Sequence, residues 1–414
     1  MQTDMRIGPD TYREIADSLV RNKSRSLLTG FGIFWGLFML LFLVGGGKGL
    51  KQMLSSNFEG FASNSIIMVS QNTSLPYKGL GEGRYWSLDN RDIERLKTMV
   101  PEIETVTGQI AGWGWNAVRG ANSFSANLKG IRADYALIEA PQLKYGRYIN
   151  DIDVLNMRKV CVIGKRVYQE LFPEGGDPCG TFLQVGSVYF QIVGVDYSSG
   201  SININGSARR SVTIPISVAQ QLMGRGDKVD IICIIGKSGV KMTGLEPRLR
   251  EVMGRRHNFD PKDEPAMLLL NLEQIFTMVD SLFRGVSFLI WLVGLGTLLA
   301  GAIGVSNIMM VTVKERTTEI GIRRAIGATP RDILSQIIQE SVALTVLAGS
   351  AGIVFSVLML NLTEIMTQHQ ASFQISFGTA VLALALLGLL GMLAGLAPAY
   401  RAMRIKPVDA MRDE

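Results

Sequence analysis

The chain has 414 residues, of which 47% are apolar and only 19% are charged, and its mean hydropathy is +0.22. Charged residues make up about a quarter of an average soluble chain, so this composition disfavours a fully soluble protein. The 42 Lys and Arg against 36 Asp and Glu give a diffuse charge of +6. Nucleic-acid-binding proteins concentrate Lys and Arg on one face, so we expect no nucleic acid partner.

Four stretches contain no Asp, Glu, Lys, Arg or His, and each exceeds the roughly 20 residues that cross a bilayer core of about 30 Å. We therefore predict an α-helical transmembrane domain of four spans, which are surrounded by membrane lipids. The charge-free stretches are residues 26–47, 285–313, 341–363 and 370–400. The predicted elements are 26–47, 285–313, 331–363 and 371–400, where the third includes an amino-terminal extension outside the membrane that carries its charged residues. A cleaved signal peptide would have a shorter apolar run and a small-residue cleavage site, so the first span is interpreted as an uncleaved anchor.

Basic residues beside the spans indicate the orientation. The segments 1–25, 314–330 and 401–414 carry most of the nearby Lys and Arg, whereas the short outer loop 364–370 has none. The positive-inside rule therefore predicts cytoplasmic termini and a cytoplasmic segment at 314–330. Residues 48–284 then form a large extracytoplasmic domain. Three cations on the outer side weaken the contrast without reversing it: Lys48, Lys51 and Arg284.

The segment 48–284 has the alternation of an α+β domain. Short β-branched runs predict strands at 65–70, 159–164, 189–195, 211–215 and 229–235. Helical spacing and caps predict helices at 87–99, with Ser87 as its cap, and at 244–256. Boundaries near residues 132 and 228 would separate an inserted subdomain (133–227) from two flanks of βαβ type. Runs rich in Gly, Ser and Asn predict loops at 77–84 and 197–210.

Two Trp and three Cys in this segment leave alternatives open. Trp113 and Trp115 fit either core packing or an exposed contact patch for a substrate or partner. Cys161, Cys179 and Cys233 are odd in number, and the sequence does not decide whether any of them form a disulfide. Cys161 and Cys233 alternate within apolar strands, which favours buried thiols over metal ligands.

The motifs of common enzymes are absent from the sequence. Of three Gly-Lys pairs only Gly236-Lys237 is followed by Ser, and Ile231 stands where a phosphate-binding loop needs its first Gly. With two His and no hydrolase motif, we expect no catalytic residue, no metal site and no directly bound cofactor.

The spans also lack the ionisable residues that bind coupling ions in many transporters. They carry instead small residues at four-residue spacing, which lets helix backbones approach closely. These helix-packing positions are Gly32 and Gly36, then Gly296, Ala300 and Gly304, then Gly391 and Gly395. Glycine is common in membrane helices, so no single pair is decisive, but together they predict spans that pack rather than line a polar pore.

The segment 307–332 is the most distinctive. Glu319 and Arg323 have the spacing of an i,i+4 ion pair, and Gly327 suits the end of a helix. The Thr-Pro-Arg-Asp run at 329–332 supplies the cap and first turn of the next helix. We predict a rigid helical elbow that presents alternating charge to the cytosol, although a solvated basic loop would have a similar composition.

This segment resembles the signature of the MacB/FtsX superfamily of ABC transporter permeases, also called type VII. Two further stretches agree, RNKSRSLLTG at 21–30 and LAPAYRAMRIKPVDAMR at 396–412. Within the large domain, residues 159–195 resemble a MacB-like periplasmic core domain. The resemblance extends over nearly the whole chain and implies porter-like and sabre-like subdomains.

The resemblance implies mechanotransmission, in which an ABC ATPase drives motion of the outer domain through the elbow. Since only 25 residues precede the first predicted span, it implies a separate ATPase subunit, which would use ATP and Mg²⁺. It also implies a dimer with a second copy or a sister permease. The implied ATPase-coupling residues are Glu315, Arg316, Glu319, Ile320, Gly321, Arg323, Arg324 and Gly327.

The first functional hypothesis is efflux of antibiotics, peptides or other amphipathic molecules from the periplasm, together with a periplasmic adaptor and an outer-membrane channel. The run at 30–36 is similar to permeases of Bacteroidota, which implies a Gram-negative inner membrane. Lipoprotein release and a cell-division-type role in regulating wall hydrolases are the alternatives. The size of the outer domain favours the first two over the last.

Overall fold

The protein is described by a computed structural model that covers residues 23–56, 60–198, 204–367 and 371–403. The chain forms two compact units, which we call the helical unit (Met1–Met53 and Leu282–Glu414) and the large domain (Leu54–Ser281). Most of the predicted segments 1–25 and 401–414 lies outside the described residues, as do parts of the predicted loops 197–210 and 364–370.

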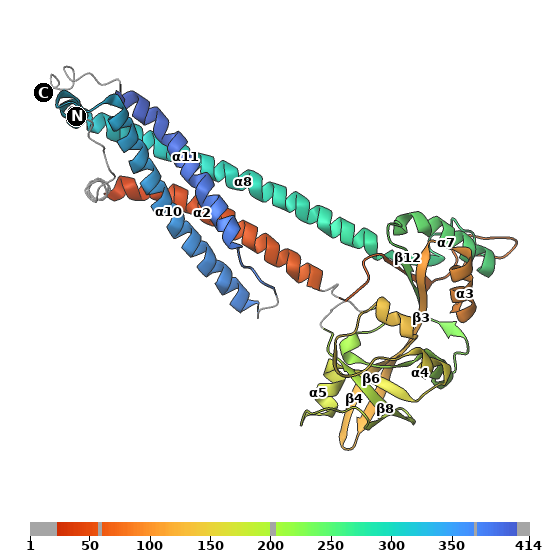
Figure 1. Cartoon of the computed structure of the whole chain (residues 1–414). Coiled ribbons are helices and arrows are strands. Elements are labelled where there is room, and N and C mark those ends of the chain that lie inside the picture. Colours follow the sequence, from red (N-terminus) through yellow and green to blue (C-terminus); the bar gives the residue numbers. More distant parts are fainter. Residues whose placement is uncertain (1–22, 57–59, 199–203, 368–370, 404–414) are drawn as a thin grey trace. The chain divides into compact units, whose positions relative to one another are not determined.

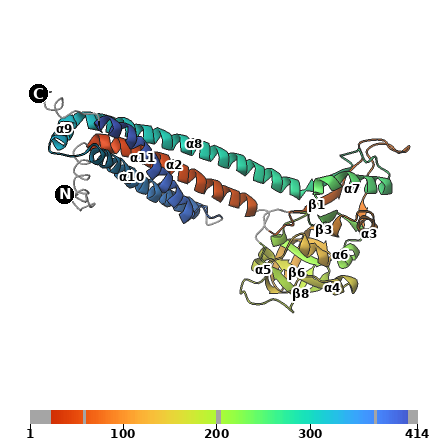
Figure 2. The same ribbon diagram turned by 45° about the horizontal axis from the view of Figure 1, so that its top comes forward.

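Within the described residues, four helices are long and apolar enough to cross a membrane, which confirms the prediction of four spans. They are α2 (Lys23–Ser56), α8 (Leu272–Glu315), α10 (Pro330–Met366) and α11 (Phe377–Met403). The helices α2 and α8 extend well beyond the predicted spans because charged residues end an apolar run without ending a helix. Their packing within the helical unit is visible in both views (Figure 1, Figure 2).

Close backbone approach at glycines holds α2 against its neighbours. A Cβ on Gly36 would lie 3.3 Å from the carbonyl oxygen of Thr297 on α8, and one on Gly352 would lie 2.9 Å from the carbonyl oxygen of Phe34. Ser356 on α10 also donates a hydrogen bond to the carbonyl oxygen of Phe38. Larger side chains at these glycines would push the helices apart, because packed interiors leave no room for added atoms.

The large domain contains a split βαβ arrangement. Its four strands are β1 (Ser65–Ser70), β3 (Ile103–Arg119), β11 (Ile231–Gly236) and β12 (Met267–Asn271). They lie in the order β12-β1-β11-β3, and all neighbours are antiparallel. Helix α3 (Asn90–Met99) connects β1 to β3, and α7 (Met242–His257) connects β11 to β12. This ferredoxin-like pattern confirms the two predicted βαβ flanks.

The same sheet continues into the middle of the chain. Its further strands are β4 (Asn122–Ile131), β5 (Leu143–Gly146), β6 (Val160–Gly164), β7 (Phe182–Val185), β8 (Val188–Asp196) and β9 (Ser211–Pro215). The pairing β4-β9 is parallel, and β9-β6 is antiparallel. Strand β3 is irregular between Gly112 and Trp115, and beyond this point its far end pairs with β7. The predicted boundary of the inserted subdomain near residue 132 stays a prediction, because strands from both sides of it belong to one continuous sheet.

The remaining elements are short and cover the sheet or connect its strands. They are β2 (Leu88–Asp89), β10 (Lys228–Val229), η1 (Ala133–Leu137), α4 (Asp151–Leu155), α5 (Lys165–Leu171), η2 (Ala208–Arg210) and α6 (Ile216–Leu222).

The strands predicted from β-branched runs are confirmed within two residues, but the predicted cap of the first helix is wrong. Asp89, not Ser87, caps α3, because its side chain accepts a hydrogen bond from the Asp92 amide and Asp92 accepts one from the Asp89 amide. The chain is extended at Leu88, which is fully buried and pairs with Val229. Burial of Leu88 in this small sheet therefore delays the start of the helix.

The two Trp side chains differ in exposure, and all three Cys are free thiols. Trp113 is 64% exposed, whereas Trp115 is half-buried, with a Cβ on Gly186 falling 2.9 Å from its ring. Cys161 and Cys233 are buried, as predicted, and burial raises the pKa of both thiols. Cys179 is a free thiol as well, and partial burial raises its pKa to about 11.

A buried ion pair joins β4 to the segment that follows η1. Lys129 is 2% exposed, and its Nζ lies 3.2 Å from Oε2 of Glu139. The hydroxyl of Tyr135 donates to the same carboxylate oxygen, also at 3.2 Å. Burial and the neighbouring Glu139 raise the pKa of Tyr135, so its hydroxyl stays protonated and remains a donor.

Candidate functional site

The elbow, residues 314–330, is a tight helical turn. Helix α8 ends at Glu315, α9 (Thr317–Ala325) follows after one residue, and α10 begins at Pro330. Thr329 caps α10 through a reciprocal capping box with Asp332, as predicted. Gly327 has a φ of +114°, a region that favours glycine, so the chain turns sharply at this residue.

The charged side chains of α9 bind to α10. Arg316 Nη1 lies 3.2 Å from Oε1 of Glu340, whose side chain is largely buried. Arg323 Nη2 lies 3.0 Å from Oε1 of Glu319, which confirms the predicted i,i+4 pair. Arg323 Nη1 also donates to Oε1 of Gln336 at 2.9 Å. One face of α9 is thus joined to α10 by two arginines spaced seven residues apart, two helical turns.

A third arginine joins α9 to α11. Arg324 Nη1 donates a hydrogen bond to the carbonyl oxygen of Met403 at 3.0 Å, in the last turn of α11. Arg316, Arg323 and Arg324 therefore direct part of their charge to α10 and α11 and are less exposed than Glu315 and Glu319. The three arginine side chains are half-buried because hydrogen-bond acceptors on α10 and α11 lie within their reach.

The opposite face of α9 is exposed and partly apolar. Ile322 is 46% exposed and Ile326 is 83% exposed, and the two are four residues apart on one helical face. Glu315 and Glu319 are also exposed. The outer face of α9 therefore combines two exposed apolar side chains with exposed carboxylates nearby.

Two of the implied coupling residues lie on the inner face instead. Ile320 is 8% exposed and packs with Ile333 and Ile337 of α10, and Gly321 is also buried. Ile322 and Ile326, which are exposed on α9, are not among the coupling residues predicted from the sequence. Their spacing from Ile320, about 200° and 240° around a helix, already places them on the opposite face.

The space under α9 is too small for a nucleotide. A cavity of about 20 Å³ lies between α8, α9 and α10, and its polar lining includes Arg316, Glu319 and Gln336. This volume has room for about one water molecule. Among the described residues of the elbow, Ile322 and Ile326 are thus exposed, whereas Arg316, Arg323 and Arg324 bind to α10 and α11.

The predicted helix-packing positions divide into two groups. Gly391 and Gly395 face α10, where an added Cβ would lie 2.7 Å from Thr345 Oγ1 and 3.0 Å from Ser341 Oγ. Gly36 contacts α8, and the Gly32 backbone lies near Gly301. Among the described residues, an added Cβ would meet no atom within 4 Å at the remaining glycines, and Ala300 beside them is exposed: these are Gly296 and Gly304.

Comparisons with known proteins agree with this architecture. Residues 26–252 match the family of MacB-like periplasmic core domains, and residues 291–407 match the FtsX-like permease carboxy-terminal family. The chain is 27% identical over 399 residues to the macrolide export ATP-binding/permease protein MacB of Bdellovibrio bacteriovorus, covering 96% of this chain and 60% of that protein. It is 30% identical over 399 residues to the pyoverdine export ATP-binding/permease protein PvdT of Pseudomonas syringae pv. tomato, covering 95% and 58%.

The chain thus spans less than two thirds of the length of these curated relatives. Among solved structures, the periplasmic region of MacB from Actinobacillus actinomycetemcomitans is 21% identical with a TM-score of 0.43. That alignment covers 54% of this chain and 96% of the other.

Proposed function

This chain belongs to the family of MacB-like and FtsX-like ABC transporter permeases, and from that premise we propose that it is the permease of an ATP-driven exporter working by mechanotransmission. The observation that carries the proposal is the two-sided α9 helix. Its inner face is joined to α10 and α11, and its outer face exposes Ile322 and Ile326. A force on the outer face therefore moves both helices together.

The proposed partner is an ABC ATPase at the cytoplasmic surface. The 414 residues hold no phosphate-binding loop, so ATP and Mg²⁺ bind to a domain outside this sequence. The ATPase contacts Glu315, Glu319, Ile322 and Ile326, and its closure displaces α9. In this proposal the arginine links transmit the displacement to the spans, the termini are cytoplasmic and the chain lies in a bacterial inner membrane.

The proposed cargo is an amphipathic molecule taken from the periplasm. The relatives are named for export of macrolides and of pyoverdine, which supports this class of cargo but not a particular compound. A periplasmic adaptor and an outer-membrane channel would complete the route. A second permease copy fits along Gly296, Ala300 and Gly304, because small residues on an uncovered helix face permit close helix contact.

The proposal is tested by affinity purification of the tagged full-length chain from native membranes, with mass spectrometry of the proteins that copurify. We expect an ABC ATPase with the wild type and its loss with Ile326→Asp. A matched control is Leu155→Asp, which changes an equally exposed residue of the large domain and should retain the ATPase. Recovery of the wild type without an ATPase would overturn the proposal.

A further inference from the structure

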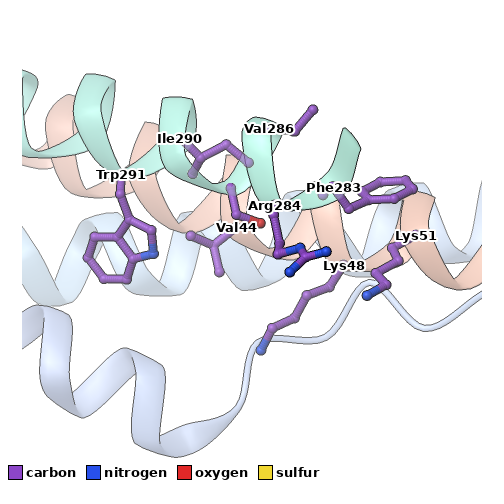
Figure 3. A pocket seen from close by; sticks show the side chains of 10 residues that line it. Val44, Lys48, Lys51, Phe283, Arg284, Val286, Ile290 and Trp291 are labelled. Carbon is purple, nitrogen blue, oxygen red and sulfur yellow. The ribbon is translucent and has the colours of Figure 1, made fainter. Parts of the chain in front are cut away.

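A pocket lies between α2 and α8 in the half of the helical unit that is remote from the elbow. Its volume is about 210 Å³. One group of lining residues is cationic and comes from both helices: Lys48, Lys51 and Arg284. Figure 3 shows these three side chains projecting beside the apolar residues of α8.

The cationic part of the pocket suits an anion. None of the ten described residues that line it is acidic, and three of them carry a positive charge. An ammonium group has three N–H donors and a guanidinium group has five, so each retains donors after binding one protein acceptor. A phosphate group offers several acceptor oxygens, so it can bind the remaining donors of more than one of these cations at once.

The rest of the pocket suits a hydrocarbon chain. Val44, Val286, Ile290 and Trp291 form its apolar part. Along α8 the apolar surface continues through exposed side chains at Phe288 and Leu292, inside the predicted span 285–313. Tryptophan is enriched where a membrane meets water, since its ring has an apolar body and a polar N–H.

The three cations of the pocket lie on the outer side of the predicted spans, where Lys and Arg are usually rare. A lysine that only reached toward water at the end of a span would not have to share a pocket with basic residues of a second helix. Convergence of cations from α2 and α8 on one apolar groove indicates a bound ligand with an anionic head and an apolar tail.

We propose that this pocket binds an anionic phospholipid, with its phosphate at Lys48, Lys51 and Arg284 and an acyl chain against Val286, Ile290 and Trp291. The site is separate from the elbow and does not depend on the proposed export function. A lipid held here would bridge α2 and α8 at the point where both helices leave the apolar part of the membrane.

The test uses the purified full-length chain in detergent and native mass spectrometry. Phosphatidylglycerol and phosphatidylcholine with identical acyl chains are titrated, and the affinity of the first bound lipid is measured. We expect tighter binding of phosphatidylglycerol than of phosphatidylcholine. The affinity should fall roughly fivefold for each cation replaced in the single variants Lys48→Gln, Lys51→Gln and Arg284→Gln, and furthest in the triple variant that combines them, which we call the pocket variant. Lys48→Arg and Lys51→Arg should retain the affinity, because the charge remains.

Two controls separate a lipid pocket from general charge attraction. The triple variant Lys314→Gln, Arg331→Gln, Arg401→Gln removes three cations at the opposite ends of the spans and should keep the first lipid. Trp291→Ala should weaken phosphatidylglycerol binding while leaving the net charge unchanged. An equal loss in both triple variants, or no loss in the pocket variant, would overturn the proposal.

The same experiment distinguishes a lipid from two other occupants of the pocket, inorganic phosphate and a second copy of the chain. Inorganic phosphate should compete only weakly, because it lacks the acyl chain, and full competition with no effect of Trp291→Ala would overturn the lipid assignment. The spectra also report the oligomeric state. If the pocket variant dissociates a dimer without changing lipid affinity, the groove is an interface between copies and the proposal is wrong.

Discussion

The guanidinium of Arg316, at the start of α9, lies 3.2 Å from the carboxylate of Glu340 in the third turn of α10, measured between Nη1 and Oε1. Glu340 is only 9% exposed, so this ion pair is largely removed from water. A buried pair of this kind adds little stability over an apolar pair, but it fixes which residues face each other. Here it fixes the rotation of α9 relative to α10.

Arg316→Met should therefore destabilise the helical unit. It leaves the buried Glu340 carboxylate without its arginine, and removal of one member of a buried pair costs about 3–5 kcal/mol. The double variant Arg316→Met, Glu340→Met should recover most of the loss, because no charge is left buried. The measurement is the thermal unfolding midpoint of the full-length chain in detergent. Arg331→Met, at an exposed position in α10, is the control.

Gly327→Val should uncouple ATP hydrolysis from motion of the large domain. A β-branched residue at a φ of +114° is strained by about 1–3 kcal/mol, so the turn between α9 and α10 would open. We expect the variant in the membrane fraction, with ATP hydrolysis retained in the copurified complex and export lost.

The control for this prediction is Gly378→Val, at a helical glycine of α11 around which an added Cβ meets no atom within 4 Å. Efflux assays and ATPase rates are compared for the three proteins. Normal export by Gly327→Val would contradict a role of the turn in coupling.

Lys129→Met should destabilise the large domain by about 3–5 kcal/mol, because it removes one member of a largely buried ion pair with Glu139. Glu139→Gln in the same background should restore part of the stability, since a neutral amide still accepts a hydrogen bond from Tyr135. Chemical denaturation of the full-length chain measures both effects. Lys97→Met, on the exposed side of α3, should change the free energy of unfolding by less than about 0.5 kcal/mol.

The stability of the large domain should fall in acid. Burial disfavours the charged form of Asp263, but hydrogen bonds from Ser74 and Leu75 outweigh this effect and lower its pKa. The pKa of Asp153 is lowered in the same way, since burial is outweighed by bonds from Arg147 and Asn150. A lowered pKa in the folded state stabilises the fold above the unfolded value near 3.9, and this contribution is lost as pH falls through the folded value.

We therefore expect unfolding midpoints that are level near neutral pH and decline below about pH 4. Tryptophan fluorescence of the full-length chain can follow this decline. The variant Asp263→Asn should be less stable at neutral pH and should show a smaller decline in acid. An unchanged acid decline in that variant would contradict the assignment to Asp263.

Local patterns were enough to predict the four spans, most strands and the capping box at Thr329. Each depends on neighbouring residues alone, such as an uninterrupted apolar run or a Thr three residues before an Asp. The hairpin of β3 and β4 was not predicted, because its long strands contain few apolar alternations. On its other edge β3 pairs with β11, whose residues lie more than a hundred positions away, as in the pair of Gln109 with Ile231.

In the elbow, too, contacts within one helix could be predicted and contacts between helices could not. The pair Glu319–Arg323 could be predicted from spacing, but the inward direction of Arg316 and Arg323 could not, since it depends on Gln336 and Glu340 of another helix. Burial of Lys129 was also beyond prediction, because a lysine in a strand is usually solvated. Long-range partners therefore decide which of the predicted charges remain available to a partner protein.

Strand β3 has a consequence for how the large domain responds to load. Its 17 residues belong first to the ferredoxin-like half and then, past the irregularity at Gly112, to the half that contains β7. At about 3.4 Å per residue the strand reaches over 50 Å. Because both halves share the backbone of β3, a force applied at Ile103 is transmitted to Arg119 through covalent bonds and does not depend on side-chain contacts. The two halves are therefore coupled through the backbone of β3, whose register with β4 shifts between Gly112 and Trp115.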